Sequence, residues 1–94
     1  NIYPAEIESV LITMPGVQDC AVFGVPDTVF GEQLAAAVQV EEKGRLEEND
    51  IKHFIAYHLA GFKVPKLIKF YSTLPREDSG KIFKRTLRDN FLKH

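Results

Sequence analysis

The segment from Val17 to Val25 (VQDCAVFGV) constrains the fold of this chain more than any other. From Cys20 onward it would be apolar on both faces of a strand, which is typical of strands that are covered on both sides. We therefore expect it at the centre of a sheet. A second strand is expected over Leu34 to Val40 and a third over Leu67 to Ser72.

Three other segments have apolar residues at the spacing that is typical of amphipathic helices. Pro4 opens the first helix at a favoured position, and Pro15 with Gly16 ends it. The second helix is expected from Glu48 to Leu59, and the third from Ile82 to Leu92.

The two later helices each have a predicted apolar face. In the second helix this face consists of Ile51, Phe54, Ile55 and His58. In the third helix it consists of Phe83, Leu87 and Phe91. Asn49 or Asp50 is expected to cap the start of the second helix, and Gly61 is expected to stop it.

Turn-forming residues separate these elements. Turns are predicted at Pro26–Asp27 and Glu41–Arg45, and loops at Gly31 and at Pro75–Gly80. The resulting order of helices and strands favours an α+β domain, with a small mixed β-sheet of about three strands and packed helices. A chain of 94 residues fits a single domain over residues 1–94.

Charge is unevenly distributed, although the net charge is only −1. Residues 1–60 carry three Lys/Arg and ten Asp/Glu, whereas residues 61–94 carry nine Lys/Arg and three Asp/Glu. A basic last third can bind a phosphate-bearing ligand. It can also be a solvated helix face that pairs with acids of the same domain, and charge alone favours this second interpretation.

The single cysteine excludes an internal disulfide and makes a reducing, cytoplasmic setting the default expectation. No apolar run approaches the roughly 20 residues that span a bilayer, so no transmembrane segment is expected. The N-terminal sequence NIYPAEIE also lacks the basic start and apolar core of a secretory signal. Peripheral membrane association of a longer protein stays open.

Gly80 and Lys81 look like the end of a phosphate-binding loop, but the rest of that motif is missing. Pro75 stands where the Walker pattern requires its first glycine, and Ile82 stands where it requires Ser or Thr.

Metal, thiol and nucleic-acid chemistry are not predicted either. His53 and His58 point about 140° apart around a helix, so they do not share a face as metal ligands. Cys20 is expected to be a small buried hydrophobic residue rather than a nucleophile. Tyr57, Phe70 and Tyr71 lie near lysines, but no RRM, KH or helix-turn-helix pattern accompanies them, so no nucleic acid is expected as a partner. A complete active site is not visible in this sequence.

The segment LPREDSGKIFKRTL resembles the final core motif of the adenylate-forming superfamily, which includes acyl-CoA synthetases, peptide-synthetase adenylation domains and beetle luciferases. That motif reads Leu-Pro-basic-x-x-Ser/Thr-Gly-Lys-Ile/Leu, followed by basic residues and a leucine. The matching residues are Leu74, Pro75, Arg76, Ser79, Gly80, Lys81, Ile82, Lys84, Arg85 and Leu87.

The rest of the chain resembles the small C-terminal domain of the same superfamily. The segments NIYPAEIESVL, AVFGVPDTVFGEQLAAAV and GFKVPK are similar to family segments in the same order, so the resemblance covers essentially the whole chain. The start NIYPAEIE is similar to the CoA-ligase branch, which includes long-chain fatty acid ligases.

This resemblance implies the mobile lid domain of a two-domain ligase. A large N-terminal domain, absent from this chain, would bind ATP and a small-molecule carboxylic acid. In one pose of the lid domain, acid and ATP would give acyl-adenylate and pyrophosphate; in the other, CoA would displace AMP. ATP and CoA would thus be substrates, and Mg²⁺ would be needed by the full-length enzyme without binding to this domain. The fragment alone would be inactive, and the resemblance leaves the acid itself open.

The resemblance also implies roles for individual residues. Lys81 matches the catalytic lysine of adenylation, and Ser79 with Gly80 would keep its loop tight. In GFKVPK, Phe62 would stack on the CoA adenine, while Lys63 and Lys66 would meet CoA phosphates. Some relatives have an arginine where this chain has Val64.

Two other functions remain alternatives at this stage. An adenylation domain that loads a carrier-protein thiol would share the same motifs. A non-enzymatic module could instead bind a phosphorylated partner, or RNA, through the basic C-terminal third, with strongly salt-dependent affinity.

Overall fold

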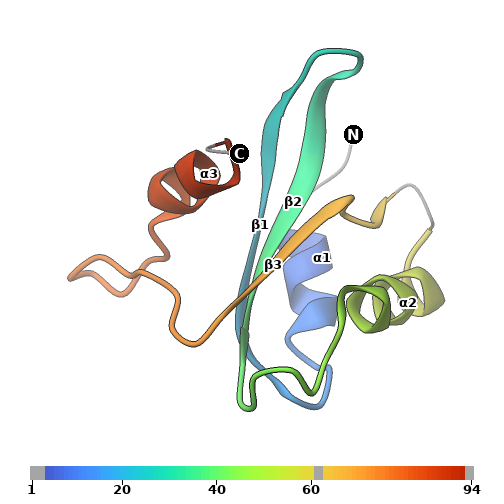
Figure 1. The fold of residues 1–94 in the computed structure, drawn as a ribbon, viewed down its shortest axis with the longest axis vertical. Helices are drawn as coiled ribbons and strands as arrows, with labels where there is room; N and C mark the ends of the chain where they lie inside the picture. The colour runs from blue at the N-terminus through green and yellow to red at the C-terminus, as the bar shows by residue number, and fades with distance from the viewer. Residues whose placement is uncertain (1–3, 61–62, 93–94) are drawn as a thin grey trace.

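The computed structural model describes residues 4–60 and 63–92, which form three helices and a three-stranded sheet (Figure 1). The elements follow the predicted order: α1 (Pro4–Leu11), β1 (Val17–Asp27), β2 (Gly31–Val40), α2 (Glu48–His58), β3 (Leu67–Tyr71) and α3 (Lys84–Leu92). The sheet has the strand order β1-β2-β3, with β1 antiparallel and β3 parallel to β2. The α+β fold with a small mixed sheet is therefore confirmed.

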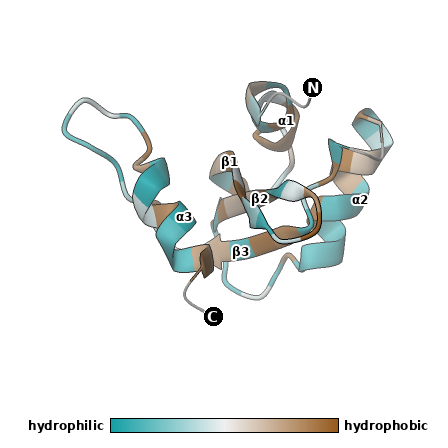
Figure 2. Ribbon diagram, turned by 90° about the horizontal axis from the view of Figure 1, so that it is seen from above, coloured by the Kyte–Doolittle hydropathy of each residue, from teal (hydrophilic) through white to brown (hydrophobic). Residues whose placement is uncertain are grey.

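Helices cover both faces of the sheet, as Figures 1 and 2 show. On one face, α1 and α2 pack together against the strands through Ile7, Leu11, Ile51 and Ile55, all fully buried. On the other face, α3 packs through Leu87 and Phe91. Each fully buried aliphatic or aromatic side chain stabilises the fold by about 1.5–3 kcal/mol.

The core on the α3 face is smaller and contains the principal aromatic contact. The rings of Phe23 and Phe91 lie 5.3 Å apart between centroids, in an edge-to-face arrangement with an interplanar angle of 88°. Such a pair adds about 0.5–1.5 kcal/mol beyond the burial of its area. Leu74 is buried in the same cluster, which ties the segment after β3 to this face.

The prediction that the first strand lies at the centre of the sheet is wrong, because β1 is an edge strand and β2 is central. Its apolar residues are buried because helices cover both faces of the sheet, and this burial does not require a neighbouring strand on each side. Side chains also satisfy backbone groups on its outer edge: Glu8 Oε2 accepts from the Val22 amide at 2.7 Å, and Arg88 Nε donates to the Gly24 carbonyl at 2.9 Å. Covering an edge in this way blocks pairing with another chain.

The predicted turn at Pro26–Asp27 and the loop at Gly31 are also wrong. Pro26 pairs with Glu32 and Asp27 with Gly31, so all four residues belong to the β1–β2 hairpin, whose turn lies at residues 28–30. Proline fits here because an edge strand does not need every amide for pairing.

The helix boundaries differ from the predicted ones by a few residues. Helix α1 ends at Leu11 before Pro15 is reached, and α3 begins only at Lys84, which leaves Phe83 outside the helix and 41% exposed. The N-cap of α2 is Glu47, so the prediction of Asn49 or Asp50 as the cap is wrong; the Glu47 amide donates to the Asp50 carboxylate at 2.8 Å.

Two further expectations for α2 have different outcomes. Phe54 is half-buried and His58 is exposed, so only Ile51 and Ile55 form the buried face of the helix. Gly61, the expected stop signal, lies outside the described residues.

None of the helices within residues 4–60 and 63–92 has the length and hydrophobicity that a bilayer span requires.

Candidate functional site

The segment around Lys81 forms a tight hairpin, which we call the lysine hairpin (residues 76–82). Arg76 and Ile82 form an antiparallel bridge at its base. Above the bridge, the Glu77 amide donates to the Lys81 carbonyl and the Gly80 amide donates to the Glu77 carbonyl, both at 2.8 Å. This pattern is typical of a three-residue hairpin loop that ends in a residue with a left-handed backbone. The predicted polar loop is thus an ordered turn.

Gly80 has φ of +92°, the left-handed conformation that this loop requires. A Cβ atom at this position would meet nothing within 4 Å, so the glycine is needed for its backbone conformation and not for space. Ser79 is exposed beside it.

Lys81 combines a fixed backbone with an unpaired side chain. On one side of Lys81, the Gly80 carbonyl accepts from Arg76 Nη1. On the other side, the Lys81 carbonyl accepts from the Glu77 amide. The side chain is exposed, and within residues 4–60 and 63–92 its ammonium has no ion-pair or hydrogen-bond partner. The tip of the hairpin projects away from the sheet in both ribbon views (Figures 1 and 2). The geometry presents one ammonium group to whatever lies beyond this domain.

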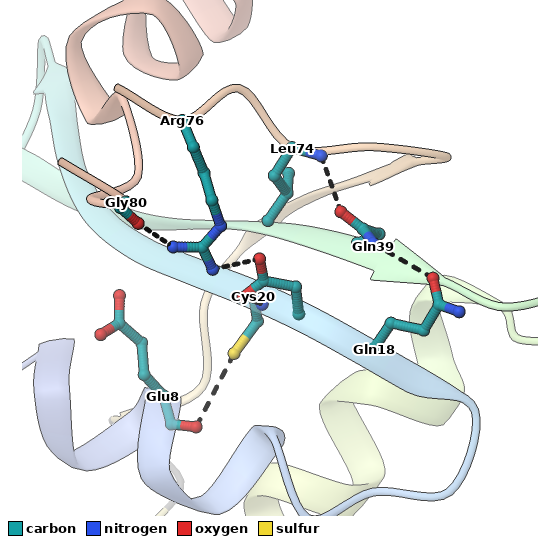
Figure 3. A network of polar contacts seen from close by, with 8 residues as sticks. Glu8, Gln18, Cys20, Gln39, Leu74, Arg76 and Gly80 are labelled. Atoms are coloured by element: carbon teal, nitrogen blue, oxygen red, sulfur yellow. Dashed lines mark hydrogen bonds and ion pairs between the residues drawn. The ribbon is translucent and has the colours of Figure 1, made fainter. Parts of the chain in front are cut away.

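Polar contacts attach the base of the lysine hairpin to the sheet (Figure 3). The Leu74 amide donates to Gln39 Oε1 at 2.8 Å, and Gln39 Nε2 donates to Gln18 Oε1 at 3.1 Å. Arg76 Nη2 pairs with the carboxylate of Asp19 on β1.

A second contact joins the start of α3 to α1 around the edge of β1. The ammonium of Lys84 lies 3.1 Å from Glu8 Oε2, the same oxygen that accepts from the Val22 amide. Several basic residues of the last third are therefore engaged by other parts of the domain, namely Lys63, Lys69, Arg76, Lys84 and Arg88. Lys81 and Arg85 have no such partner among the described residues.

Cys20 lies beneath this region and is buried at 8% exposure, as predicted. Burial raises the pKa of its thiol from 9.0 to about 12, and the neighbouring carboxylates of Glu8 and Asp19 add to the increase. A thiol with this pKa stays protonated at neutral pH, so Cys20 is a packing residue and not a nucleophile.

The two described lysines that were predicted to bind CoA contact different parts of the domain. Lys63 pairs with Glu6 of α1, whereas the ammonium of Lys66 lies 5.0 Å from the ring centroid of Phe30 at the tip of the β1–β2 hairpin. Phe62 lies outside the described residues. Lys66 is exposed, but Lys63 would have to leave Glu6 to reach a phosphate.

In the described part of the chain, no three His, Cys, Asp or Glu side chains come together as a possible metal site.

The contact between Asp19 and Arg76 could not be predicted from the sequence. The two residues lie 57 positions apart, and Arg76 was assigned only as the basic position of the core motif. A charged residue within the strand, directly before its apolar run, was the one available signal.

Comparison with known proteins gives consistent matches over nearly the whole chain. The profile of the family described as AMP-binding enzyme C-terminal domain matches residues 6–81. A long-chain-fatty-acid–CoA ligase of Mycobacterium tuberculosis and a feruloyl-CoA synthase of an Amycolatopsis species are each 44% identical to the chain over 91 residues. Both matches cover 97% of this chain, which spans only 18% of the length of either relative.

A solved structure agrees with this comparison. The fatty acyl CoA synthetase of Mycobacterium tuberculosis matches with a TM-score of 0.88 and 43% identity, over 97% of this chain and 18% of that one.

Proposed function

The chain belongs to the AMP-binding enzyme C-terminal domain family, and we propose that Lys81 catalyses acyl-adenylate formation in the full-length protein. Its relatives are acyl-CoA ligase-like adenylate-forming enzymes. The observation that carries the proposal is the geometry of Lys81, whose backbone is held on both sides while its ammonium is exposed and unpaired.

The chain is one domain of the proposed enzyme, and an N-terminal domain that binds ATP and a carboxylic acid is its partner. The matched relatives support this division, because the chain corresponds to 18% of their length. Mg²⁺ would accompany ATP in that other domain. The relatives also differ in the acid that their names specify while sharing 44% identity with this chain, so we place the choice of acid outside this domain.

The first step joins two anions and therefore needs a cation between them. A carboxylate oxygen attacks the α-phosphorus of ATP, a new O–P bond forms, and pyrophosphate leaves with the electrons of the broken P–O bond. Negative charge accumulates on the oxygens around that phosphorus. The Lys81 ammonium offsets the repulsion and orients both reactants, and its fixed backbone limits the entropy lost on forming this contact.

In the second step, the thiol of CoA attacks the acyl carbonyl and AMP leaves. CoA is the proposed acceptor because the two relatives at 44% identity are named as CoA enzymes, although a relative that is 43% identical is named as an acyl-carrier-protein ligase. Lys66 is the better placed of the two described lysines for a CoA phosphate, because it is exposed and its contact is with an aromatic ring. Lys63 contributes once its pair with Glu6 opens.

The test replaces Lys81 by alanine in the full-length enzyme and assays each step separately. Acyl-adenylate formation from acid and ATP is expected to fall by about 10²–10³-fold, because a preorganised group that stabilises transition-state charge is lost. Thioester formation from supplied acyl-adenylate and CoA should continue at the wild-type rate.

Lys43→Ala provides the matched control, since Lys43 is an exposed lysine in the turn after β2. It removes the same charge without touching the lysine hairpin, so both steps should be unchanged. Equal adenylation rates in the Lys81→Ala variant and in this control would overturn the proposal.

A further inference from the structure

An irregularity at the start of β1 determines which side chains face the lysine hairpin. Val17 pairs with Val40 and Asp19 with Gln39, so Gln18 is an extra residue in β1, as in a β-bulge. In a regular strand Val17 and Asp19 would share a face. The bulge separates them: Val17 packs in the core on the α1–α2 side, whereas Asp19 reaches the hairpin on the α3 side.

The bulge therefore gives the α3 face two consecutive polar side chains. Gln18 bonds to Gln39, which in turn accepts from the Leu74 amide at 2.8 Å. Asp19 pairs with Arg76 two residues further along. The segment that leads to Lys81 is thus attached at Leu74 through Gln39, which Gln18 orients, and at Arg76 directly through Asp19 (Figure 3).

Arg76 extends this attachment to the peptide group directly before Lys81. One guanidinium nitrogen pairs with Asp19, and the other donates to the Gly80 carbonyl on the opposite side of the hairpin. A planar guanidinium can make two such contacts at a fixed angle, and lysine cannot. The position of the Gly80–Lys81 peptide is thus determined by a residue of β1.

Stability alone gives a poor account of this pair. The Arg76 side chain is 45% exposed, and ion pairs so open to solvent contribute little to folding. The Asp19 side chain is only 19% exposed, and its other oxygen accepts from the Cys20 amide at 2.9 Å, so the carboxylate itself has a fixed orientation. The arrangement suits the positioning of a mobile group better than the stabilisation of a core.

We propose that Asp19 and Arg76 are positioning residues for adenylate formation. They act through Lys81, by fixing the direction in which the Lys81 side chain projects from the hairpin. This inference rests on the proposed function of Lys81. It assigns a role in the first step to a strand residue that lies outside the lysine hairpin.

The experiment uses Asp19→Asn and Arg76→Lys in the full-length enzyme. Asn keeps the shape of Asp19 and an oxygen for the Cys20 amide, and Lys keeps the charge of Arg76 but not its fork. We expect kcat for adenylation to fall about 10- to 100-fold in each variant, the scale expected for a small displacement of a reacting group. KM for ATP and acid, and the thioester step from supplied acyl-adenylate, should remain unchanged.

The matched control is Glu48→Gln, which breaks the 2.8 Å ion pair between Glu48 and Lys52 on α2. It removes one carboxylate charge from a partly exposed pair on the other side of the sheet. Both half-reactions should stay at the wild-type rate.

A double variant tests whether Asp19 acts through Lys81. If it does, adding Asp19→Asn to Lys81→Ala costs no further adenylation activity, because residues that act as a unit are non-additive. An additional loss in the double variant would overturn the inference, as would an equal loss of both half-reactions in Asp19→Asn alone.

The outcomes also separate this inference from the proposed function. If Lys81→Ala abolishes adenylation while Asp19→Asn and Arg76→Lys do not slow it, only the positioning role is wrong. If Lys81→Ala leaves adenylation intact, the proposed function is wrong and the positioning role fails with it.

Discussion

At the scale of single residues, two glycines have the same backbone conformation, one inside the lysine hairpin and one outside it. Comparing substitutions at the two separates an effect on adenylation from an effect on the stability of the domain. Gly80 has φ of +92° and Gly44 has φ of +85°, and neither has an atom within 4 Å of an added Cβ. Gly80→Ala should cost about 1–2 kcal/mol of stability, the usual cost of a left-handed backbone at a residue with a side chain. It should also slow adenylation, because the loop that presents Lys81 is distorted.

Gly44→Ala is the control for this prediction. It should lower the free energy of unfolding by a similar amount, measured by urea denaturation, and leave adenylation at the wild-type rate. Equal adenylation rates in the two variants would show that the loop conformation at Gly80 is unimportant for catalysis.

A second prediction at this scale concerns the Cys20 thiol. Because the pKa is raised from 9.0 to about 12, the folded protein keeps this proton at a pH where the unfolded chain has lost it. The contribution to stability is fully present below about pH 9 and is lost as the pH rises through about 12. Urea denaturation across this range should show the decline in the wild type, with a shallower slope in Cys20→Ala.

Labelling gives an independent measurement on the same thiol. A disulfide reagent at neutral pH should react slowly with the native protein and quickly in denaturant. Rapid labelling of the native protein would contradict the assignment of Cys20 as a packing residue.

The sequence could predict Lys81, Ser79 and Gly80 as a unit, because they lie in one contiguous motif. It could not predict the partner of Arg76, because a contact across 57 residues depends on the register of β1. The bulge at Gln18 shifts that register by one residue, and nothing in the local pattern VQDC marks it.

At the scale of helices and strands, the existence and order of all six elements could be predicted, whereas their neighbours in space could not. The apolar run in β1 was interpreted as a central strand. Helices on both faces produce the same pattern in an edge strand, and hydrophobic patterning does not distinguish the two arrangements. Pro26 was the contrary signal, because proline within a strand favours an edge.

The packing of helix α3 on the sheet predicts which of its leucines contribute to stability. Leu87 is fully buried against the sheet, whereas Leu92, near the end of the same helix, is 52% exposed. Leu87→Ala should destabilise the domain by about 2–5 kcal/mol through lost burial and a cavity. Leu92→Ala should change the free energy of unfolding by no more than about 0.5 kcal/mol.

Thermal or urea unfolding of the two variants provides the measurement. Similar losses in both would mean that α3 does not pack as described.

At the scale of the whole molecule, we expect residues 1–94 to fold without the rest of a ligase. The domain has a core on each face of its sheet, and a chain of this size buries roughly 60% or more of its unfolded surface. Urea denaturation should give one cooperative transition with a free energy of unfolding of about 5–10 kcal/mol.

The same purified chain should form no acyl-adenylate from acid and ATP, because the proposed binding sites for ATP and the acid lie in the N-terminal domain. Turnover by residues 1–94 alone would contradict the proposal that ATP and the acid bind to the N-terminal domain.

The placement of α3 has a practical consequence for where the domain can be cut. The family profile stops at residue 81, immediately after the glycine of the hairpin, yet the side chains that cover one face of the sheet, Leu87 and Phe91, come later. A truncation at Lys81 would keep the residue of greatest interest and expose Phe23 and its neighbours to water. The smallest piece of this protein that can be expected to stay folded therefore extends through Leu92.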